Sequence, residues 1–144
     1  VGAVLIDAGS PPEAFGVEVP AWLVSRWAPH GEEQVIAQAE LLPVLLSILL
    51  WKERLKGRYI LWWMDNDGSR QALVNGYSRS WKNAALVDDV TMGMSLSCMY
   101  SWFARVPTEC NMGDMPSRLE WGKLKALVPG VIVKDIEEGI WTRV

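Results

Sequence analysis

The chain has 144 residues, a length typical of one domain. Half of the residues are apolar and 22% are charged, a composition that excludes a disordered or collagen-like chain. The formal net charge of −3 argues against a protein that coats nucleic acid through overall positive charge. The charge is uneven, however. Residues 51–82 hold seven basic and three acidic side chains, so a basic zone on an acidic body can still attract a polyanion.

Cysteine and histidine are scarce. Cys98 and Cys110 are the only cysteines and His30 is the only histidine, so a structural zinc site, which needs about four such ligands, is set aside. We interpret His30 as a surface-loop residue and not as a catalytic base. Two cysteines do not make a disulfide framework, so we expect an intracellular protein, cytoplasmic or nuclear.

The first half of the chain predicts strands followed by one long helix. Residues 1–7 and 21–27 are apolar and β-branched enough to be strands, and residues 15–19 are expected to be extended. Pro11, Pro12 and Gly16 indicate a loop. Residues 31–56 predict a helix that ends at Gly57 and bends at Pro43. Its apolar part is too short and too polar to cross a membrane, so no membrane partner is expected.

The second half alternates between strands and helices. Residues 58–64 are nearly all apolar, which predicts a central strand buried on both faces. Helices are expected at 69–75, closed by Gly76, at 81–97, after Asn111 as an N-cap, and at 123–127. Further strands are expected at 99–106 and, more weakly, at 131–133 and 140–144. This order predicts a single α/β domain with a mixed sheet.

Three acidic residues stand out by position. Glu40 lies in the apolar helix, Asp65 directly follows the most apolar strand, and Asp114 begins a helix after the last clear strand. If the strands are neighbours, the three carboxylates converge at one sheet edge, where Mg²⁺ would stabilise their ionised forms. Each also has a structural interpretation. Glu40 could pair with Arg58 or Arg70.

The other two acids could act as helix caps. Asp65 or Asp67 could cap the next helix, with Asp67 the better candidate, and Asp114 could serve only as the capping partner of Asn111.

In the order and spacing of four segments, the chain resembles the ribonuclease H domain of retroelement reverse transcriptases. The matching segments are residues 36–42, 62–67, 102–107 and 111–118, within a resemblance that covers about residues 1–120. Residues 121–144 would then form a C-terminal extension. The resemblance implies a ribonuclease H-like fold, with a mixed β-sheet flanked by α-helices.

The resemblance also implies a function. Members of the family bind an RNA–DNA hybrid and hydrolyse its RNA strand with two Mg²⁺ ions, for which Mn²⁺ can substitute, held by four carboxylates. Glu40, Asp65 and Asp114 match three of these catalytic and metal-binding positions. Ser117 and Arg118 match the closing motif, while Gly113 stands where such elements more often have alanine. An upstream reverse transcriptase domain is the implied partner, and a catalytically inactive scaffold of the same fold is the alternative.

The fourth carboxylate, an aspartate on the family's first strand, can be placed in two ways. In the favoured register, residues 2–5 correspond to the family's second strand, so the aspartate lies upstream of Val1 and hydrolysis by this chain is feeble or absent. In the other register, Asp7 is the ligand, but this needs two more strands between Asp7 and Glu40.

The nine tryptophans supply candidate substrate contacts as well as core residues. Trp62 and Trp63 point to opposite faces of one strand, so both faces are expected to be covered. Asn66, Trp81 and Lys82 are candidate substrate-binding residues, because an exposed tryptophan beside a cation can stack on a nucleic acid. Burial is the structural interpretation of Trp81. Core positions are expected for Trp22, Trp27, Trp51 and Trp102, and a solvated helix end for the basic residues 52, 54, 56 and 58.

Overall fold

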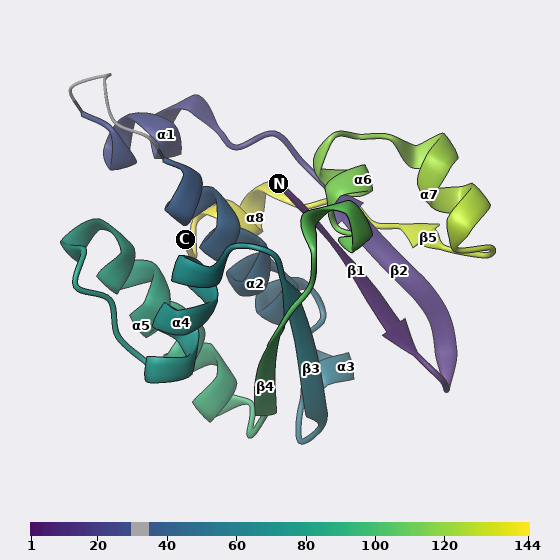
Figure 1. Ribbon diagram of the computed structural model, residues 1–144, viewed down its shortest axis with the longest axis horizontal. Coiled ribbons are helices and arrows are strands. Elements are labelled where there is room, and N and C mark those ends of the chain that lie inside the picture. Colours follow the sequence, from purple (N-terminus) through teal and green to yellow (C-terminus); the bar gives the residue numbers. More distant parts are fainter. Residues whose placement is uncertain (30–34) are drawn as a thin grey trace.

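The computed structural model describes residues 1–29 and 35–144, and it confirms a mixed α/β architecture. The expected helix start at residues 31–33 and the expected loop at His30 lie outside these ranges. Figure 1 labels the elements, which in chain order are β1 (Gly2–Asp7), β2 (Ser10–Gly16), α1 (Ala21–Trp27), α2 (Ile36–Leu50), α3 (Lys52–Leu55), β3 (Tyr59–Met64), α4 (Asp67–Asn75), α5 (Trp81–Leu96), β4 (Tyr100–Arg105), the 3-10 turn η1 (Thr108–Cys110), α6 (Asp114–Ser117), α7 (Trp121–Leu127), β5 (Ile132–Val133) and α8 (Glu138–Trp141).

The strands form two small sheets instead of the one mixed sheet that the sequence predicts. In the first sheet, β1 pairs antiparallel with β2, and β2 pairs parallel with the short β5. In the second, β3 and β4 pair in parallel over their full length. The edge of β1 opposite β2 and the edge of β3 opposite β4 therefore have no strand partner among the described residues.

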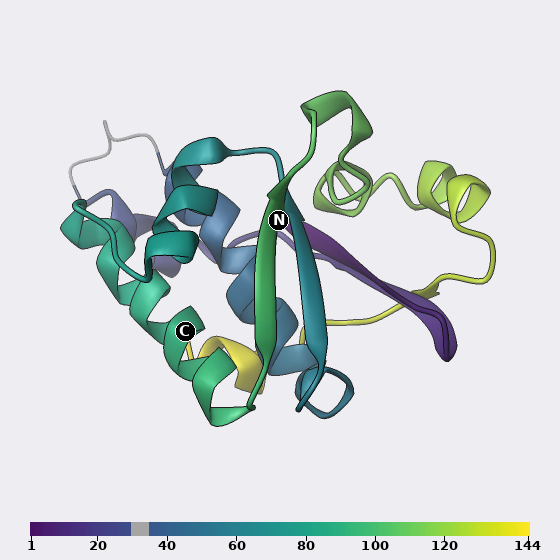
Figure 2. The same ribbon diagram turned by 60° about the horizontal axis from the view of Figure 1, so that its bottom comes forward.

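The hydrophobic core is built around α2, which is apolar on nearly all sides because its neighbours surround it. Helix α5 packs along α2, and Gly93 of α5 lies so close that an added Cβ would come within 3.0 Å of Ile48. Helices α4 and α8 also contact α2. In Figure 2, α2, α4 and α5 lie together on one side of the β3–β4 pair, while the β1–β2 hairpin extends away from them.

Three sequence predictions in the outer parts of the chain are wrong. Residues 21–27 form helix α1, whose buried side chains Leu23 and Trp27 stand four residues apart, the spacing of one helix face. Residues 138–141 form helix α8, not a strand, and Ile140 packs against the core. Pro11 and Pro12 lie inside β2, not in a loop. The strand tolerates them because β5 pairs only farther along, at Glu13 and Ala14, and the β1–β2 register shifts opposite them.

The central strand was expected to be buried on both faces, but β3 alternates. Its Met64 is buried, whereas Leu61 and Trp63 are more than half exposed. Of the tryptophans expected in the core, Trp27 and Trp51 are buried and Trp22 and Trp102 are exposed, a correction for the last two. Helices cover only one face of the β3–β4 pair, so the other face leaves its aromatic side chains in solvent.

Two helices end at glycine as the sequence predicts, but two of the predicted N-caps are wrong. Gly57 and Gly76 have φ of 69° and 68°, the left-handed backbone that the sequence predicts at these helix ends. The N-cap of α4 is Asn66, whose side-chain oxygen accepts a hydrogen bond from the Ser69 N–H at 2.9 Å, and not Asp67. Helix α6 begins at Asp114 after Gly113, so Asn111 is not its N-cap.

In the part of the chain described, no helix is both long and apolar enough to cross a membrane.

Candidate metal-binding site

A cavity of about 1000 Å³ lies between β1 and β3, and we call it the inter-sheet groove. All of β1 lines one wall and all of β3 the other, so the groove runs along two strand edges. Side chains of α2, including Pro43 and Val44, line it as well, and the segment before α6 contributes residues 111–114. The groove is therefore bordered by both sheets, the central helix and the α6 segment.

Glu40, Asp65 and Asp114 all line this groove, and we call them the carboxylate cluster. Glu40 comes from the first turns of α2, Asp65 directly follows β3, and Asp114 is the first residue of α6. Each is partly buried. The fold thus brings to one cavity three acids that are 25 and 49 positions apart in the chain.

The electrostatics of Glu40 show that the three acids interact. Burial, the negative charges of Asp65 and Asp114, and a hydrogen bond to Asp65 together raise the pKa of Glu40 to about 7, with burial the largest cause. The amino group of Val1 opposes this shift. Neither arginine proposed as a partner neutralises Glu40, because Arg58 bonds to Asp7 and Arg70 bonds to Asp67. Near neutral pH, the protonated and ionised forms of Glu40 are therefore both populated.

Two glycines position α6, a role that the sequence analysis missed. Gly2 and Gly16 face each other across the β1–β2 pair. A Cβ on Gly16 would lie 1.9 Å from the carbonyl oxygen of Pro116, and one on Gly2 would lie 2.6 Å from the Ser117 nitrogen. Glycine at both positions lets the backbone of α6 lie directly on the hairpin, which places Asp114 at the groove. Two glycines at the ends of adjacent strands are the only sequence signal for this contact.

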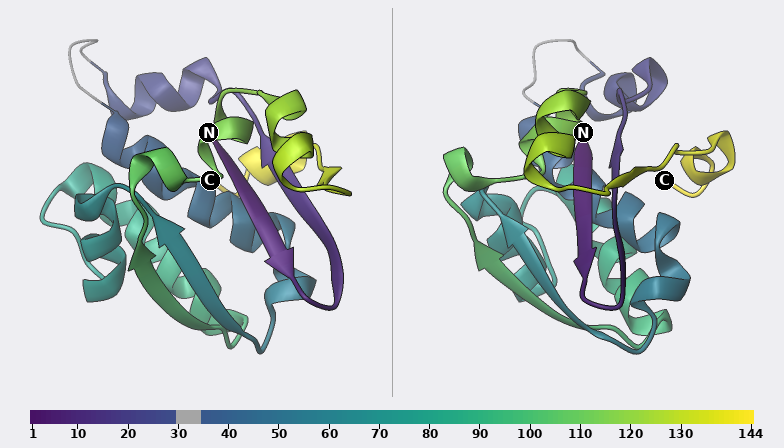
Figure 3. Two further views of the ribbon diagram at one scale, coloured as in Figure 1. Left: turned by 45° about the vertical axis from the view of Figure 1, so that its right-hand side comes forward. Right: turned by 90° about the vertical axis from the view of Figure 1, so that its right-hand side faces the viewer.

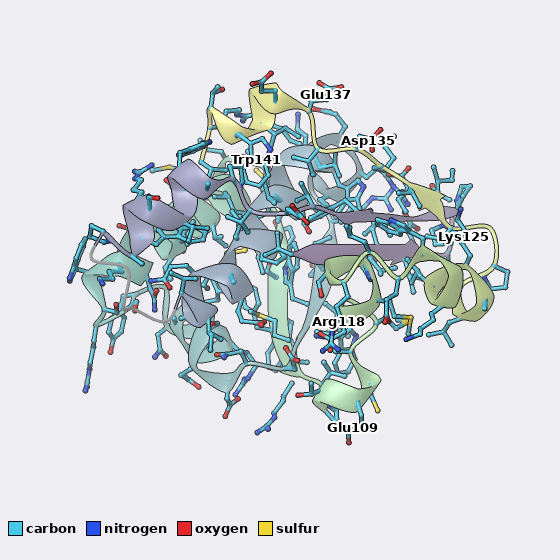
Figure 4. All side chains as sticks on the ribbon, turned by 90° about the horizontal axis from the view of Figure 1, so that it is seen from above. Glu109, Arg118, Lys125, Asp135, Glu137 and Trp141 are labelled. Atoms are coloured by element: carbon cyan, nitrogen blue, oxygen red, sulfur yellow. The ribbon has the colours of Figure 1, made fainter. Side chains whose placement is uncertain are left out.

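Arg118 and Ser117, which match the closing motif of the resemblance, both contact Asp114. The Arg118 guanidinium lies 3.3 Å from Asp114 Oδ2, and the Ser117 hydroxyl donates a 2.8 Å hydrogen bond to the Asp114 carbonyl. Asn111 accepts a hydrogen bond from the Gly113 N–H at 3.0 Å, which shapes the turn before the helix. Seen from above, Arg118 and Trp141 of α8 lie on opposite sides of the β1–β2 hairpin (Figure 4).

Asp7 lies at the wrong end of the groove to join the carboxylate cluster. Its Oδ2 atom accepts a 2.8 Å hydrogen bond from Arg58, the residue before β3, whereas Asp65 follows the end of β3. Seven residues of extended strand separate Arg58 from Asp65, or about 23 Å. The register that makes Asp7 the first ligand also needs residues 21–27 to be a strand, and they form α1. The geometry therefore does not place Asp7 in the carboxylate cluster.

The three predicted substrate-binding residues are not in the groove. Asn66 uses its side-chain oxygen as the α4 cap. Trp81 begins α5 and is 74% exposed, against the structural interpretation that it is buried. The Lys82 ammonium lies 5.5 Å from the centre of the Trp81 ring, within the range of a cation–π interaction. The exposed Trp81 and the part-buried Lys82 thus form a pair that does not line the inter-sheet groove.

Carboxylate oxygens are the donors that Mg²⁺ prefers, so the chemistry of the cluster fits a hard cation. The mutual repulsion around Glu40 is the electrostatic situation that a cation relieves. The cluster is not preorganised, however: among residues 1–29 and 35–144, no group of three or more His, Cys, Asp or Glu residues is arranged to hold a metal ion.

No protein-family model, curated protein or solved structure matches the chain.

Proposed function

We propose that the carboxylate cluster is the metal-binding site of a ribonuclease H-type nuclease, which hydrolyses the RNA strand of an RNA–DNA hybrid. The observation that carries the proposal is the interaction of Glu40 with both Asp65 and Asp114 in one groove. Three ionised carboxylates from distant segments repel one another, and a bound cation would favour their approach. The order of these segments also fits a ribonuclease H-like fold.

In this proposal the protein's own residues hold and orient the ions. Glu40 and Asp65, which share a hydrogen bond, would supply two donors, and Asp114 would supply a third carboxylate. Arg118 restrains the Asp114 carboxylate through the 3.3 Å contact. Mg²⁺ held by these carboxylates would supply an activated water and charge stabilisation for the leaving oxygen in phosphodiester cleavage.

The substrate and partner are proposed from the resemblance. Selectivity for the RNA strand would come from contacts to 2′-hydroxyl groups across the minor groove of the hybrid. The exposed Trp81 ring, with the Lys82 ammonium near it, offers a surface on which a sugar or base can stack. Because the net charge is −3, affinity for the hybrid alone would be modest, and an upstream reverse transcriptase domain would supply the rest.

The test is cleavage of a labelled RNA–DNA hybrid in Mg²⁺ and in Mn²⁺ by this chain and by Asp65→Asn. We expect slow, metal-dependent cleavage by the parent chain and none by the variant, because Asp65 is a proposed ligand. Asp67→Asn is the matched control, since Asp67 lies two residues away but pairs with Arg70. Equal rates for the parent chain and Asp65→Asn would remove the catalytic assignment.

A catalytically inactive scaffold of this fold is the second candidate, and one observation favours it. No described group of acids is arranged as a finished metal site. Calorimetric titration separates the two candidates: heat of binding at millimolar Mg²⁺ that Glu40→Gln abolishes supports the nuclease, and no binding by the parent chain supports the scaffold.

A further inference from the structure

The uncovered face of the β3–β4 pair carries a row of large apolar side chains. Side chains at paired positions of these parallel strands point to the same side, as do every second side chain along each strand. On the side away from the helices, each of these side chains is between 52% and 87% exposed, and we call them the aromatic face: Tyr59, Leu61, Trp63, Tyr100 and Trp102. In the left view of Figure 3, the β3–β4 pair lies in front of the helices, and no described helix crosses in front of it.

The two strands hold the aromatic face in a fixed shape. Ile60, Trp62 and Phe103 point the other way and pack in or against the main core, which fixes both strands to the helices. On the aromatic face itself, the rings of Tyr59 and Tyr100 stack with their centres 4.8 Å apart. A partner would therefore meet a preformed surface, so binding would lose little conformational entropy.

The aromatic face is large enough for a stable interface. From the exposed fractions, and at about 150–250 Å² per aromatic side chain, its five residues expose roughly 700 Å² together. This area is larger than the largest apolar patch of a typical monomer, which is about 300–600 Å². Two such faces in contact would bury roughly 1400 Å², within the range of about 1200–2000 Å² that specific protein complexes bury.

The charges around the aromatic face favour a protein partner over a nucleic acid. Strand β3 has no charged residue, and the only one in β4 is its last residue, Arg105. Arg105 lies 3.8 Å from Asp67, and Arg58, just before β3, lies 2.8 Å from Asp7. A surface that stacks the bases of a single strand also needs cations for its phosphates, and these two arginines already have acidic partners. The chemistry therefore suits an apolar protein surface.

A second copy of the chain offers such a surface. In a dimer with two-fold symmetry, the same patch lies on both sides of the interface, so it must be complementary to itself. The aromatic face meets this condition because it brings no like charges together. Leu61 and Trp102 are paired neighbours in the middle of the face. A two-fold axis near them would bury Trp102, the more exposed of the two tryptophans of the face, at the centre of the interface.

We propose that the protein forms a two-fold symmetric dimer in which the aromatic faces of two copies pack against each other. The two β3–β4 pairs would lie about 10 Å apart, as packed sheets do. Because few polar contacts accompany this area, we expect a dissociation constant on the order of 10 µM. Below about 1 µM the chain is then mostly monomeric, so stability measured there describes the uncovered face. The proposal does not rest on metal binding or catalysis, since no residue of the carboxylate cluster belongs to the aromatic face.

Sedimentation equilibrium of the chain between about 1 and 200 µM tests the proposal. We expect monomers at the lowest concentration and dimers at the highest. The tryptophan emission should shift to shorter wavelength over the same range, because Trp63 and Trp102 leave water as the dimer forms.

Two variants locate the interface. Trp102→Arg places like charges near the two-fold axis and should raise the dissociation constant at least about tenfold. Trp81→Arg is the matched control, because Trp81 is 74% exposed, against 72% for Trp102, but begins α5 outside the aromatic face. It should dimerise as the parent chain does. Tyr59→Lys repeats the test at one end of the face, and circular dichroism at about 1 µM verifies that each variant keeps the parent's fold.

Four results would overturn the proposal. A chain that stays monomeric up to about 200 µM has no such interface. A dimer that neither Trp102→Arg nor Tyr59→Lys weakens uses another surface. Assemblies that grow beyond the dimer would show that the contact is not a closed two-fold one. Binding of oligouridine to the monomer at about 1 µM, removed by Trp102→Ala, would assign the face to single-stranded nucleic acid.

Discussion

The β1–β2 hairpin and the β3–β4 pair both border the inter-sheet groove, but they are stabilised in different ways. The hairpin is held by polar contacts at its tip, where Arg54 pairs with Asp7 and Glu13, and by close backbone packing at its base, where α6 lies on Gly2 and Gly16. The β3–β4 pair is held by hydrophobic burial on its helix-covered side, while Trp63 and Trp102 remain exposed on the other.

The fold therefore positions the carboxylates of the cluster in two different ways. Asp65 is fixed by its place at the end of β3, a strand anchored in the main core. Asp114 depends on a four-residue helix that touches the hairpin through glycine backbones. A short helix contributes little stability of its own, so the position of Asp114 is expected to be the more sensitive of the two to mutation. The predictions below test the two regions against each other.

The largest effect is expected at the base of the hairpin. Gly16→Ala should destabilise the protein by about 3 kcal/mol, because the new Cβ would overlap the Pro116 carbonyl and force α6 away. Urea unfolding measures this effect. Gly122→Ala is the control, since a Cβ there meets nothing within 4 Å and alanine favours the helix. Equal effects of the two substitutions would contradict the proposed packing of α6.

The next prediction compares a buried tryptophan that contacts the hairpin with an exposed tryptophan of the β3–β4 pair. Trp51 is 4% exposed and donates a 2.8 Å hydrogen bond from Nε1 to Glu13, which links the core to the hairpin. Trp51→Phe should cost about 2 kcal/mol, since the lost bond is to a charged group. Trp102→Phe, at a side chain 72% exposed, should change the free energy of unfolding by less than about 0.5 kcal/mol. A larger loss from Trp102→Phe would mean that its exposed face is covered in solution.

A smaller effect should appear in the pH dependence of stability. The pKa of Glu40 rises from its ordinary 4.5 to about 7 in the folded protein, so the folded state holds this proton more tightly. Its contribution to stability is therefore present below pH 4.5 and is lost as the pH rises toward 7. Glu40→Gln should flatten the stability profile over this range in thermal unfolding. An unchanged slope would show that the pKa of Glu40 is not raised in the folded protein.

The smallest effect is expected at the opposite end of the groove. A hydrogen bond from the Gly9 N–H, together with the charges of Arg58 and Arg54, holds the pKa of Asp7 below its ordinary 3.8. The stability that this carboxylate contributes is present above pH 3.8 and is lost as the pH falls below it. Asp7→Asn should therefore lower the melting temperature slightly at pH 7, and the difference should disappear in acid.

The sequence predicted best where one physical signal dominated. The β3 and β4 segments and the α5 segment were located within one or two residues, because long apolar runs and glycine stops are local features. The convergence of Glu40, Asp65 and Asp114 on one groove was also anticipated, from Glu40 in the apolar helix, Asp65 after a strand and Asp114 at a helix start. Their electrostatic interaction supports the expected cluster, although a finished metal site remains a prediction.

The wrong predictions concern features that depend on tertiary packing. Residues 21–27 carry apolar side chains at spacings that suit either a strand or a helix, and burial of Leu23 and Trp27 on one helix face decided the outcome. The exposure of Trp102 could not be read from the sequence, since it depends on which face the helices cover. The basic residues expected as a solvated helix end include Arg54 and Arg58, which instead bind the hairpin tip.

The two prolines in β2 have a consequence for self-association. Pro11 and Pro12 lack an amide hydrogen, and they occupy the stretch of β2 that β5 leaves uncovered. That outer border is thus a poor template for stacking further molecules into fibrils or soluble polymers. If concentrated solutions of the chain ever grow β-rich assemblies, growth should start from the inward border of β1 or β3, and blocking the groove should suppress it.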